Sequence, residues 1–168
     1  LPSDTIEVLY ELYNSTAGGN WTWNATLGNP WIFTIDPNPC AEKWQGVFCS
    51  LAYNSSLYLS VIDLYDMNLF GTIPKSLGTL SDLDSLAMPY NHLYGTIPES
   101  LGNITELRVL YLYSNNLNGT IPKGLQNLPL LEEVILGYNH LEGMVADVFM
   151  ISPQMLYIDI SYNHLYGP

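Results

Sequence analysis

Residues 107–122 read LRVLYLYSNNLNGTIP. The same pattern of leucine, asparagine, glycine, isoleucine and proline is repeated along the last two thirds of the chain. Its central motif, Leu-x-Gly-Thr-Ile-Pro, begins at Leu69, Leu93 and Leu117, with a degraded copy at Leu141 and a partial copy at Leu165. The step between copies is 24 residues and never slips. A fixed period of this length is typical of a solenoid, in which one supersecondary unit is repeated and stacked along an axis.

Each 24-residue copy has the same internal pattern of apolar positions. Residues three and five places after the start of a copy alternate with polar or aromatic neighbours, which predicts a strand with one buried face. A glycine follows in every copy, as a backbone with positive φ or a close contact requires. Proline after the isoleucine keeps the chain extended and cannot donate a ladder hydrogen bond. We therefore expect each copy to form a strand, a turn, an extended segment and a short irregular return.

Copies of this kind bury their apolar side only by stacking, so their strands should form one parallel sheet with a spacing of about 4.8 Å. The copies span residues 59–82, 83–106, 107–130, 131–154 and 155–168, the last one truncated. The same position holds Asn91, Asn115, Asn139 and Asn163 in four copies and Met67 in the first. Because a buried amide must be hydrogen-bonded, these residues predict a structural asparagine ladder between neighbouring copies.

The repeat resembles the plant-type leucine-rich repeat over residues 59–168. The residues that carry this resemblance are Leu107-x-x-Leu110-x-Leu112-x-x-Asn115-x-Leu117-x-Gly119-x-Ile121-Pro122. Residues 1–58 are similar to the N-terminal cap of the same family. That similarity rests on Leu9 and Leu12 of a predicted helix, Gly18-Gly19-Asn20-Trp21, Trp31, and Pro39-Cys40 through Trp44-x-Gly46-Val47-x-Cys49.

The resemblance implies a right-handed α/β solenoid of about five repeats, with a concave parallel sheet and a helical, disulfide-bonded N-terminal cap. It also implies that ligands bind the concave face. The chain is similar to extracellular regions of leucine-rich-repeat receptor-like proteins, to secreted inhibitors of wall-degrading enzymes, and to algal and protist surface proteins. Three departures from the pattern, Met67, Val145-Ala146 and Ser152, suggest looser stacking around the fourth repeat.

The residues of segment 1–58 also predict a helical, disulfide-bonded cap. Asp4 and Glu7 suit a helix start, Ile6, Leu9 and Tyr13 form one stripe, and Gly18-Gly19 should end the helix. Cys40 and Cys49 lie close together beside four tryptophans, which predicts a short-loop disulfide in an oxidising compartment. This lid would cover the first coil, whereas no matching lid follows the last repeat, so we expect more chain or another subunit there.

Charge and glycosylation motifs indicate the compartment and exclude some partners. Sixteen acidic residues against four basic ones give a formal charge of −12, which would repel a nucleic acid. No apolar run approaches the roughly 18 residues of a spanning helix, and without a starting Met or a signal segment we expect a processed chain. Six Asn-x-Ser/Thr sequons begin at Asn14, Asn20, Asn24, Asn54, Asn103 and Asn118. We therefore expect an extracellular, secreted or cell-surface glycoprotein.

The outward positions of the repeat strands are rich in tyrosine and acid. Among twenty such positions, seven are Tyr, four are Asp or Glu, and none is Lys or Arg. The candidate ligand-binding residues are Asp63, Tyr65, Asp66, Tyr90, Tyr111, Tyr113, Glu133, Tyr138, Tyr157, Asp159 and Tyr162. Tyrosine is common in recognition surfaces because it offers rigid contact area and a hydroxyl group, although tyrosine also simply suits an exposed strand.

Other chemistry receives little support from the sequence. His92, His140 and His164 share one position, but duplication of a Tyr-Asn-His-Leu segment explains them, so we expect no metal and no cofactor. Glu133 and Asp159 could flank a water as in a glycosidase, yet an open sheet excludes no solvent. Thr72, Thr96 and Thr120 form a column that resembles an ice-binding array, but one column is narrow.

We therefore expect a non-catalytic extracellular module that binds a protein, a peptide or a cell-wall glycan through its concave face. The alternative is a structural glycoprotein subunit packed into a cell-surface or extracellular fibre assembly, favoured by the low charge and the uncovered last repeat.

Overall fold

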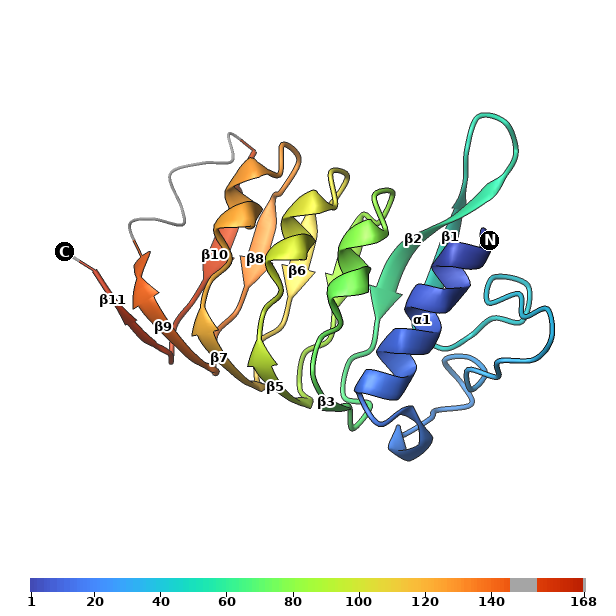
Figure 1. Ribbon diagram of the computed structural model, residues 1–168, viewed down its shortest axis with the longest axis horizontal. Coiled ribbons are helices and arrows are strands. Elements are labelled where there is room, and N and C mark those ends of the chain that lie inside the picture. The colour runs from blue at the N-terminus through green and yellow to red at the C-terminus, as the bar shows by residue number, and fades with distance from the viewer. Residues whose placement is uncertain (146–153, 168) are drawn as a thin grey trace.

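The repeats stack into a solenoid, and the first strand of every repeat joins one sheet (Figure 1). The computed structural model describes residues 1–145 and 154–167. The repeat strands are β2 (Leu57–Asp63), β4 (Ser85–Ala87), β6 (Val109–Tyr111), β8 (Glu133–Ile135) and β10 (Tyr157–Asp159). They pair in parallel in this order, and equivalent residues of successive repeats lie opposite each other. The predicted α/β solenoid with a parallel concave sheet is confirmed.

The extended segment of each repeat forms a second sheet that the sequence analysis did not predict. Its strands are β3 (Phe70–Gly71), β5 (His92–Thr96), β7 (Asn116–Thr120), β9 (His140–Met144) and β11 (His164–Tyr166). The recurring glycine lies within it: Gly119 has a φ of 73°, and a Cβ there would lie 2.9 Å from Cγ2 of Thr96. Both the backbone angle and the neighbouring threonine methyl group therefore require glycine.

The return of three repeats is a short 3₁₀ helix. These helices are η2 (Lys75–Thr79), η3 (Glu99–Asn103) and η4 (Lys123–Asn127), each preceded by the proline of its repeat. They stack close to one another, because a Cβ on Gly102 would lie 2.5 Å from the backbone of Gly124. Between the helices and the two sheets, the apolar positions of the first three repeats are buried, as the pattern predicts, whereas those of the truncated fifth repeat are half-buried. Ala146 and Ser152, two of the expected departures, lie outside the described residues.

Three of the four asparagines of the predicted ladder are buried, Asn163 is half-buried, and all four are hydrogen-bonded. Oδ1 of Asn115 accepts the backbone N–H of Leu93 at 2.9 Å, and its Nδ2 donates to the carbonyls of Met88 and Leu112 at 2.9 and 3.1 Å. Each amide thus ties its own turn to the preceding repeat. In the first repeat the cap replaces this arrangement, because Nε2 of Gln45 donates to the buried Sδ of Met67 at 3.5 Å.

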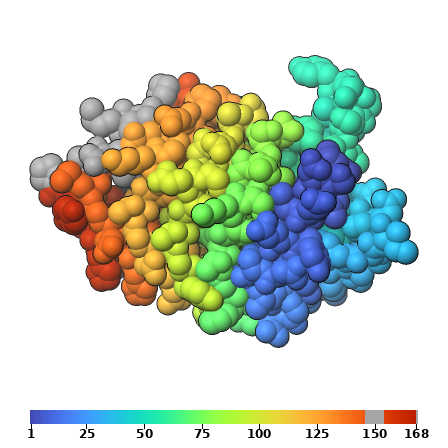
Figure 2. Space-filling model, viewed as in Figure 1, coloured from blue at the N-terminus to red at the C-terminus, as the bar shows by residue number. Residues whose placement is uncertain are grey.

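The cap covers the first coil with a helix, an aromatic cluster and a hairpin. Helix α1 (Ser3–Ser15) lies beside η2, followed by η1 (Gly18–Asn20). Strand β1 (Val47–Leu51) pairs antiparallel with β2 and extends the concave sheet by one strand. The resulting hairpin projects from the body at the upper right of Figure 2. Strand β1 was not predicted from the sequence.

The helix end differs from the expected glycine termination. The helix stops at Ser15, and Ala17 takes the left-handed conformation with a φ of 56°, rather than Gly18 or Gly19. Gly18 is needed for another reason, because a Cβ there would lie 2.2 Å from the ring of Tyr13. The buried stripe also differs: it consists of Val8, Leu9 and Leu12, since the helix contacts the repeats through these residues and leaves Ile6 half-buried.

The Cys40–Cys49 disulfide is formed and fastens the loop that carries the tryptophan cluster. The indoles of Trp31 and Trp44 stack with centroids 5.5 Å apart, and Trp21 contacts Trp31 edge to face at 4.9 Å. Buried indoles need hydrogen-bond acceptors. Trp31 donates to the carbonyl of Gln45 at 2.8 Å, Trp21 to the carbonyl of Thr16 at 2.9 Å, and Trp44 to Oε2 of Glu42 at 2.8 Å. The three buried indoles are therefore both packed and hydrogen-bonded.

Candidate binding face

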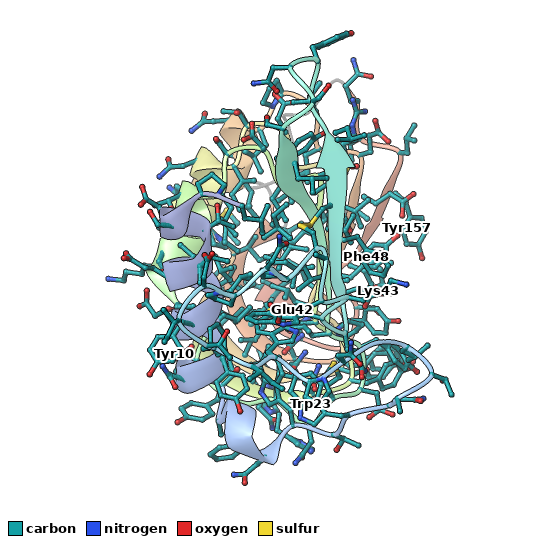
Figure 3. All side chains as sticks on the ribbon, turned by 90° about the vertical axis from the view of Figure 1, so that its right-hand side faces the viewer. Tyr10, Trp23, Glu42, Lys43, Phe48 and Tyr157 are labelled. Carbon is teal, nitrogen blue, oxygen red and sulfur yellow. A yellow bond between two sulfur atoms is a disulfide. The ribbon has the colours of Figure 1, made fainter. Side chains whose placement is uncertain are left out.

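The first sheet brings side chains 24 residues apart into rows across its outer surface. We call the twenty positions on the outer side of β2, β4, β6, β8, β10 and the turns that follow them the concave face; Ala87, Pro89 and Gly137 among them are buried. They are Val61, Asp63, Tyr65, Asp66, Ser85, Ala87, Pro89, Tyr90, Val109, Tyr111, Tyr113, Ser114, Glu133, Ile135, Gly137, Tyr138, Tyr157, Asp159, Ser161 and Tyr162. One row runs directly from strand to strand in the order Asp63, Ala87, Tyr111, Ile135 and Asp159. All eleven predicted site residues lie on this face. Figure 3 shows Tyr157 on the sheet side and Tyr10 of α1 on the opposite side of the molecule.

The tyrosines of the concave face lie at the surface and contact one another. Tyr65, Tyr90, Tyr138, Tyr157 and Tyr162 are at least half exposed, and Tyr111 and Tyr113 are half-buried. Tyr90 meets Tyr65 and Tyr113 edge to face, with ring centroids 5.3 and 5.2 Å apart. Tyr138 and Tyr162 stack in parallel at 4.1 Å. The rings therefore form two groups rather than one continuous platform.

The backbone beneath several of these rings is strained. The residue before each ladder asparagine has a positive φ, between 52° and 56° in Tyr90, Ser114, Tyr138 and Tyr162. A left-handed backbone is rare for a bulky residue, and asparagine or glycine adopts it at lower cost. Three large aromatic side chains thus stand where a smaller residue would fold more easily. Strain of this kind is concentrated at functional sites in proteins.

A hydrogen bond links the middle of the face across two strands. The hydroxyl of Tyr111 donates to Oε2 of Glu133, and this bond together with burial raises the pKa of Tyr111 to about 12. Burial raises the pKa of Tyr113, and the neighbouring Tyr90, Tyr65 and Asp63 add to the shift. A hydrogen bond with Tyr162 raises the pKa of Tyr138. These phenols stay protonated at neutral pH, so they present hydroxyl groups rather than charges.

The negative charges of the face have no basic side chain within it. Oδ1 of Asp63 accepts the N–H of Tyr65 at 3.3 Å, and Oδ1 of Asp159 accepts the N–H of Ser161 at 2.9 Å. Arg108 directly precedes β6 and is paired with Asp84 at 3.4 Å and Glu132 at 2.5 Å. Within residues 1–145 and 154–167, these are the only salt bridges. The face is therefore anionic.

Residues considered for other chemistry lie mostly elsewhere. His92, His140 and His164 are exposed at the first positions of β5, β9 and β11, on the second sheet. The His140 and His164 rings stack with centroids 5.9 Å apart. Groups of three metal-ligating residues are absent from the described part of the chain. Glu133 pairs in register with Tyr157, and Asp159 pairs with Ile135, so the two carboxylates are not directly opposed.

The six sequons leave the concave face free. Asn14, Asn20 and Asn24 lie in the cap, and Asn54 lies in the loop between β1 and β2. Asn103 ends η3, and Asn118 is exposed on β7 of the second sheet. None of the helices in residues 1–145 and 154–167 has the length and apolarity to cross a bilayer.

Three features of the site escaped the sequence analysis: the left-handed tyrosines, the Tyr111–Glu133 hydrogen bond and the second sheet. The first had no clear signal, because tyrosine precedes three of the four ladder asparagines and rarely takes a left-handed backbone. The second had none, since it depends on how side chains on neighbouring strands lean toward each other.

Comparison with known proteins agrees with the fold. Residues 105–165 match a family model described as leucine rich repeat. A probable leucine-rich repeat receptor-like protein kinase of Arabidopsis thaliana is 31% identical over 87 residues, which cover 49% of this chain and 9% of that protein. The chain thus spans about a tenth of that relative's length.

Two solved structures from Arabidopsis thaliana are similar over much of the chain. A chain of the BIR3–SERK2 complex has a TM-score of 0.80 and 26% identity, and the match covers 97% of this chain and 84% of that one. The leucine-rich-repeat ectodomain of the membrane receptor kinase GASSHO1/SCHENGEN3, in complex with CASPARIAN STRIP INTEGRITY FACTOR 2, has a TM-score of 0.68 and 28% identity. That match covers 78% of this chain and 15% of the ectodomain.

Proposed function

Because the chain carries a plant-type leucine-rich-repeat domain, we propose that it is an extracellular module that binds a protein or peptide through its concave face and catalyses no reaction. The similar chains include one from a complex of two proteins and one ectodomain in complex with a named factor. The Cys40–Cys49 disulfide supports an oxidising compartment.

The strained, left-handed backbone of three exposed tyrosines is the main support for this proposal. Tyr90, Tyr138 and Tyr162 are 50%, 53% and 69% exposed although each has a positive φ. Burial of the rings therefore contributes little to offset the strain, and contact with a ligand would account for them. The absence of sequons from the concave face also supports it, because a glycan there would block access.

Selection from a randomised displayed-peptide library tests the proposal. The folded wild type is compared with the double variant Tyr90→Asn, Tyr138→Asn, which removes two rings while asparagine tolerates the left-handed backbone. We expect the enriched peptides to bind the variant at least tenfold more weakly. The matched control is Tyr94→Ser, Tyr166→Ser, which removes two exposed phenols from the second sheet. Equal retention by all three proteins would reject the concave face as the site.

A structural role in an assembly is the second candidate, and the cap hairpin favours it. Strand β1 is an edge of the concave sheet, and Phe48 and Leu51 on it are 54% and 70% exposed. Exposed apolar edge strands tend to pair with other chains. Light scattering should show concentration-dependent polymers that Leu51→Lys abolishes if this role holds, whereas a monomer at all concentrations contradicts it.

A further inference from the structure

One row of the concave face has a negative charge at each end and no charge between. Asp63 and Asp159 occupy equivalent positions of β2 and β10, and the in-register residues between them are Ala87, Tyr111 and Ile135. Asp63 is exposed and Asp159 is half-buried. Between them, Ala87 is buried and Tyr111 and Ile135 are half-buried. Because the hydroxyl of Tyr111 donates to Glu133, the accessible part of the centre consists of an aromatic ring and apolar groups.

The spacing of this row fits an extended polypeptide. Four strand steps of about 4.8 Å place Asp63 and Asp159 about 19 Å apart along the sheet. An extended chain advances about 3.3 Å per residue, so it covers that distance in about six residues. A ligand crossing the strands would therefore meet the two carboxylates with side chains about six residues apart.

The arrangement of the rings disfavours a sugar as the occupant. Tyr65, Tyr90 and Tyr113 meet edge to face, with interplanar angles of 62° and 80°, and Tyr138 and Tyr162 cover one face of each other. Ring faces are therefore partly used within the protein. The exposed edges, hydroxyl groups and faces that remain suit cationic side chains, which bind tyrosine faces and carboxylates.

We propose that the concave face binds an extended cationic peptide segment, with basic side chains about six residues apart that contact Asp63 and Asp159 and a small or apolar stretch between them over Ala87, Tyr111 and Ile135. This inference rests on the proposed function and specifies its ligand. The concave face contains no Lys or Arg that competes for the two carboxylates.

The test uses the same displayed library and reads the composition of the selected peptides. We expect enrichment of Lys or Arg pairs five to seven positions apart. A synthetic peptide with that pattern should bind the Asp63→Asn, Asp159→Asn variant about fivefold or more weakly, and added salt should weaken its binding to the wild type. Asparagine keeps the side-chain oxygen that accepts the Tyr65 and Ser161 N–H groups, so the turns persist.

A matched control separates the two carboxylates from the net charge of the protein. Asp4→Asn, Glu7→Gln removes two exposed charges from α1 and should leave the affinity unchanged. Equal loss in both variants overturns the inference, because binding then follows net charge alone. Selection of uncharged peptides that Tyr90→Asn, Tyr138→Asn abolishes also overturns it, but leaves the concave face as the binding site. If no peptide is enriched, both proposals fail.

Discussion

Asn115 illustrates how a single side chain joins two repeats. Its amide bonds the backbone of Leu93 and Met88 in one repeat and of Leu112 in its own. Asn115→Ala leaves these buried groups without partners, which we expect to lower the free energy of unfolding by about 2–4 kcal/mol. Urea denaturation measures the change. The neighbouring Asn116 is exposed, so Asn116→Ala should cost less than about 0.5 kcal/mol; similar losses in both variants would contradict the ladder.

The Tyr111–Glu133 pair gives the face a measurable titration. The pKa of Tyr111 is raised to about 12, mainly because its hydroxyl donates to Glu133. A tyrosine with a raised pKa stabilises the fold fully below its unfolded pKa of about 10, and this contribution disappears as the pH rises through 12. In ultraviolet titration, Glu133→Gln should move one phenol to lower pH. An unchanged titration curve would show that the pair is not formed in solution.

At the residue scale, burial and hydrogen bonding were predictable where the 24-residue period gives equivalent residues the same environment. The buried leucines and the ladder asparagines recur at fixed positions, so burial and hydrogen bonding followed from the pattern alone. The left-handed backbone of Tyr90 and Tyr138 did not, because glycine is absent at that position and tyrosine rarely takes this conformation. Tertiary contacts of the ladder impose it.

At the scale of elements, prediction depended on whether an element has its own local signal. Strands β2, β6 and β8 have a buried residue flanked by more exposed ones, and in β4 the buried Leu86 follows the half-buried Ser85; the alternation of the sequence predicted all four. Strands β5, β7 and β9 of the second sheet also alternate exposed and more buried positions, but the recurring glycine and the proline after it indicated a turn and an extended segment rather than a strand. The β1 hairpin was missed because the Trp-rich segment around it indicated only a compact, disulfide-bonded loop.

The stack of 3₁₀ helices depends on close backbone contact. A Cβ on Gly102 would lie 2.5 Å from the Gly124 backbone, so Gly102→Ala must push η3 and η4 apart. We expect a loss of about 1–3 kcal/mol in the free energy of unfolding, measured by urea denaturation. Gly19→Ala in η1 is the control, because a Cβ there meets nothing within 4 Å. Equal stability of the two variants would mean that the helices have room to separate.

At the scale of the whole molecule, the cap and the repeats share one core. The buried cluster runs from Val8 and Trp21 in the cap through Met67 to Leu141 in the fourth repeat. Solenoids unfold as coupled neighbouring units, so a cap that packs on the first coil should unfold together with it. The six cap aromatics Tyr13, Trp21, Trp23, Trp31, Phe33 and Trp44 contact one another and provide a local probe of this event.

Removing the disulfide tests this coupling. Cys40 and Cys49 are nine residues apart, and opening such a loop costs about 2–3 kcal/mol through the entropy of the unfolded chain. In Cys40→Ala, Cys49→Ala we expect tryptophan fluorescence and far-ultraviolet circular dichroism to show one shared urea transition at lower midpoint, because the repeats lose stability together with their lid. A fluorescence transition that shifts while the circular dichroism midpoint stays at its wild-type value would mean that the repeats fold without the cap.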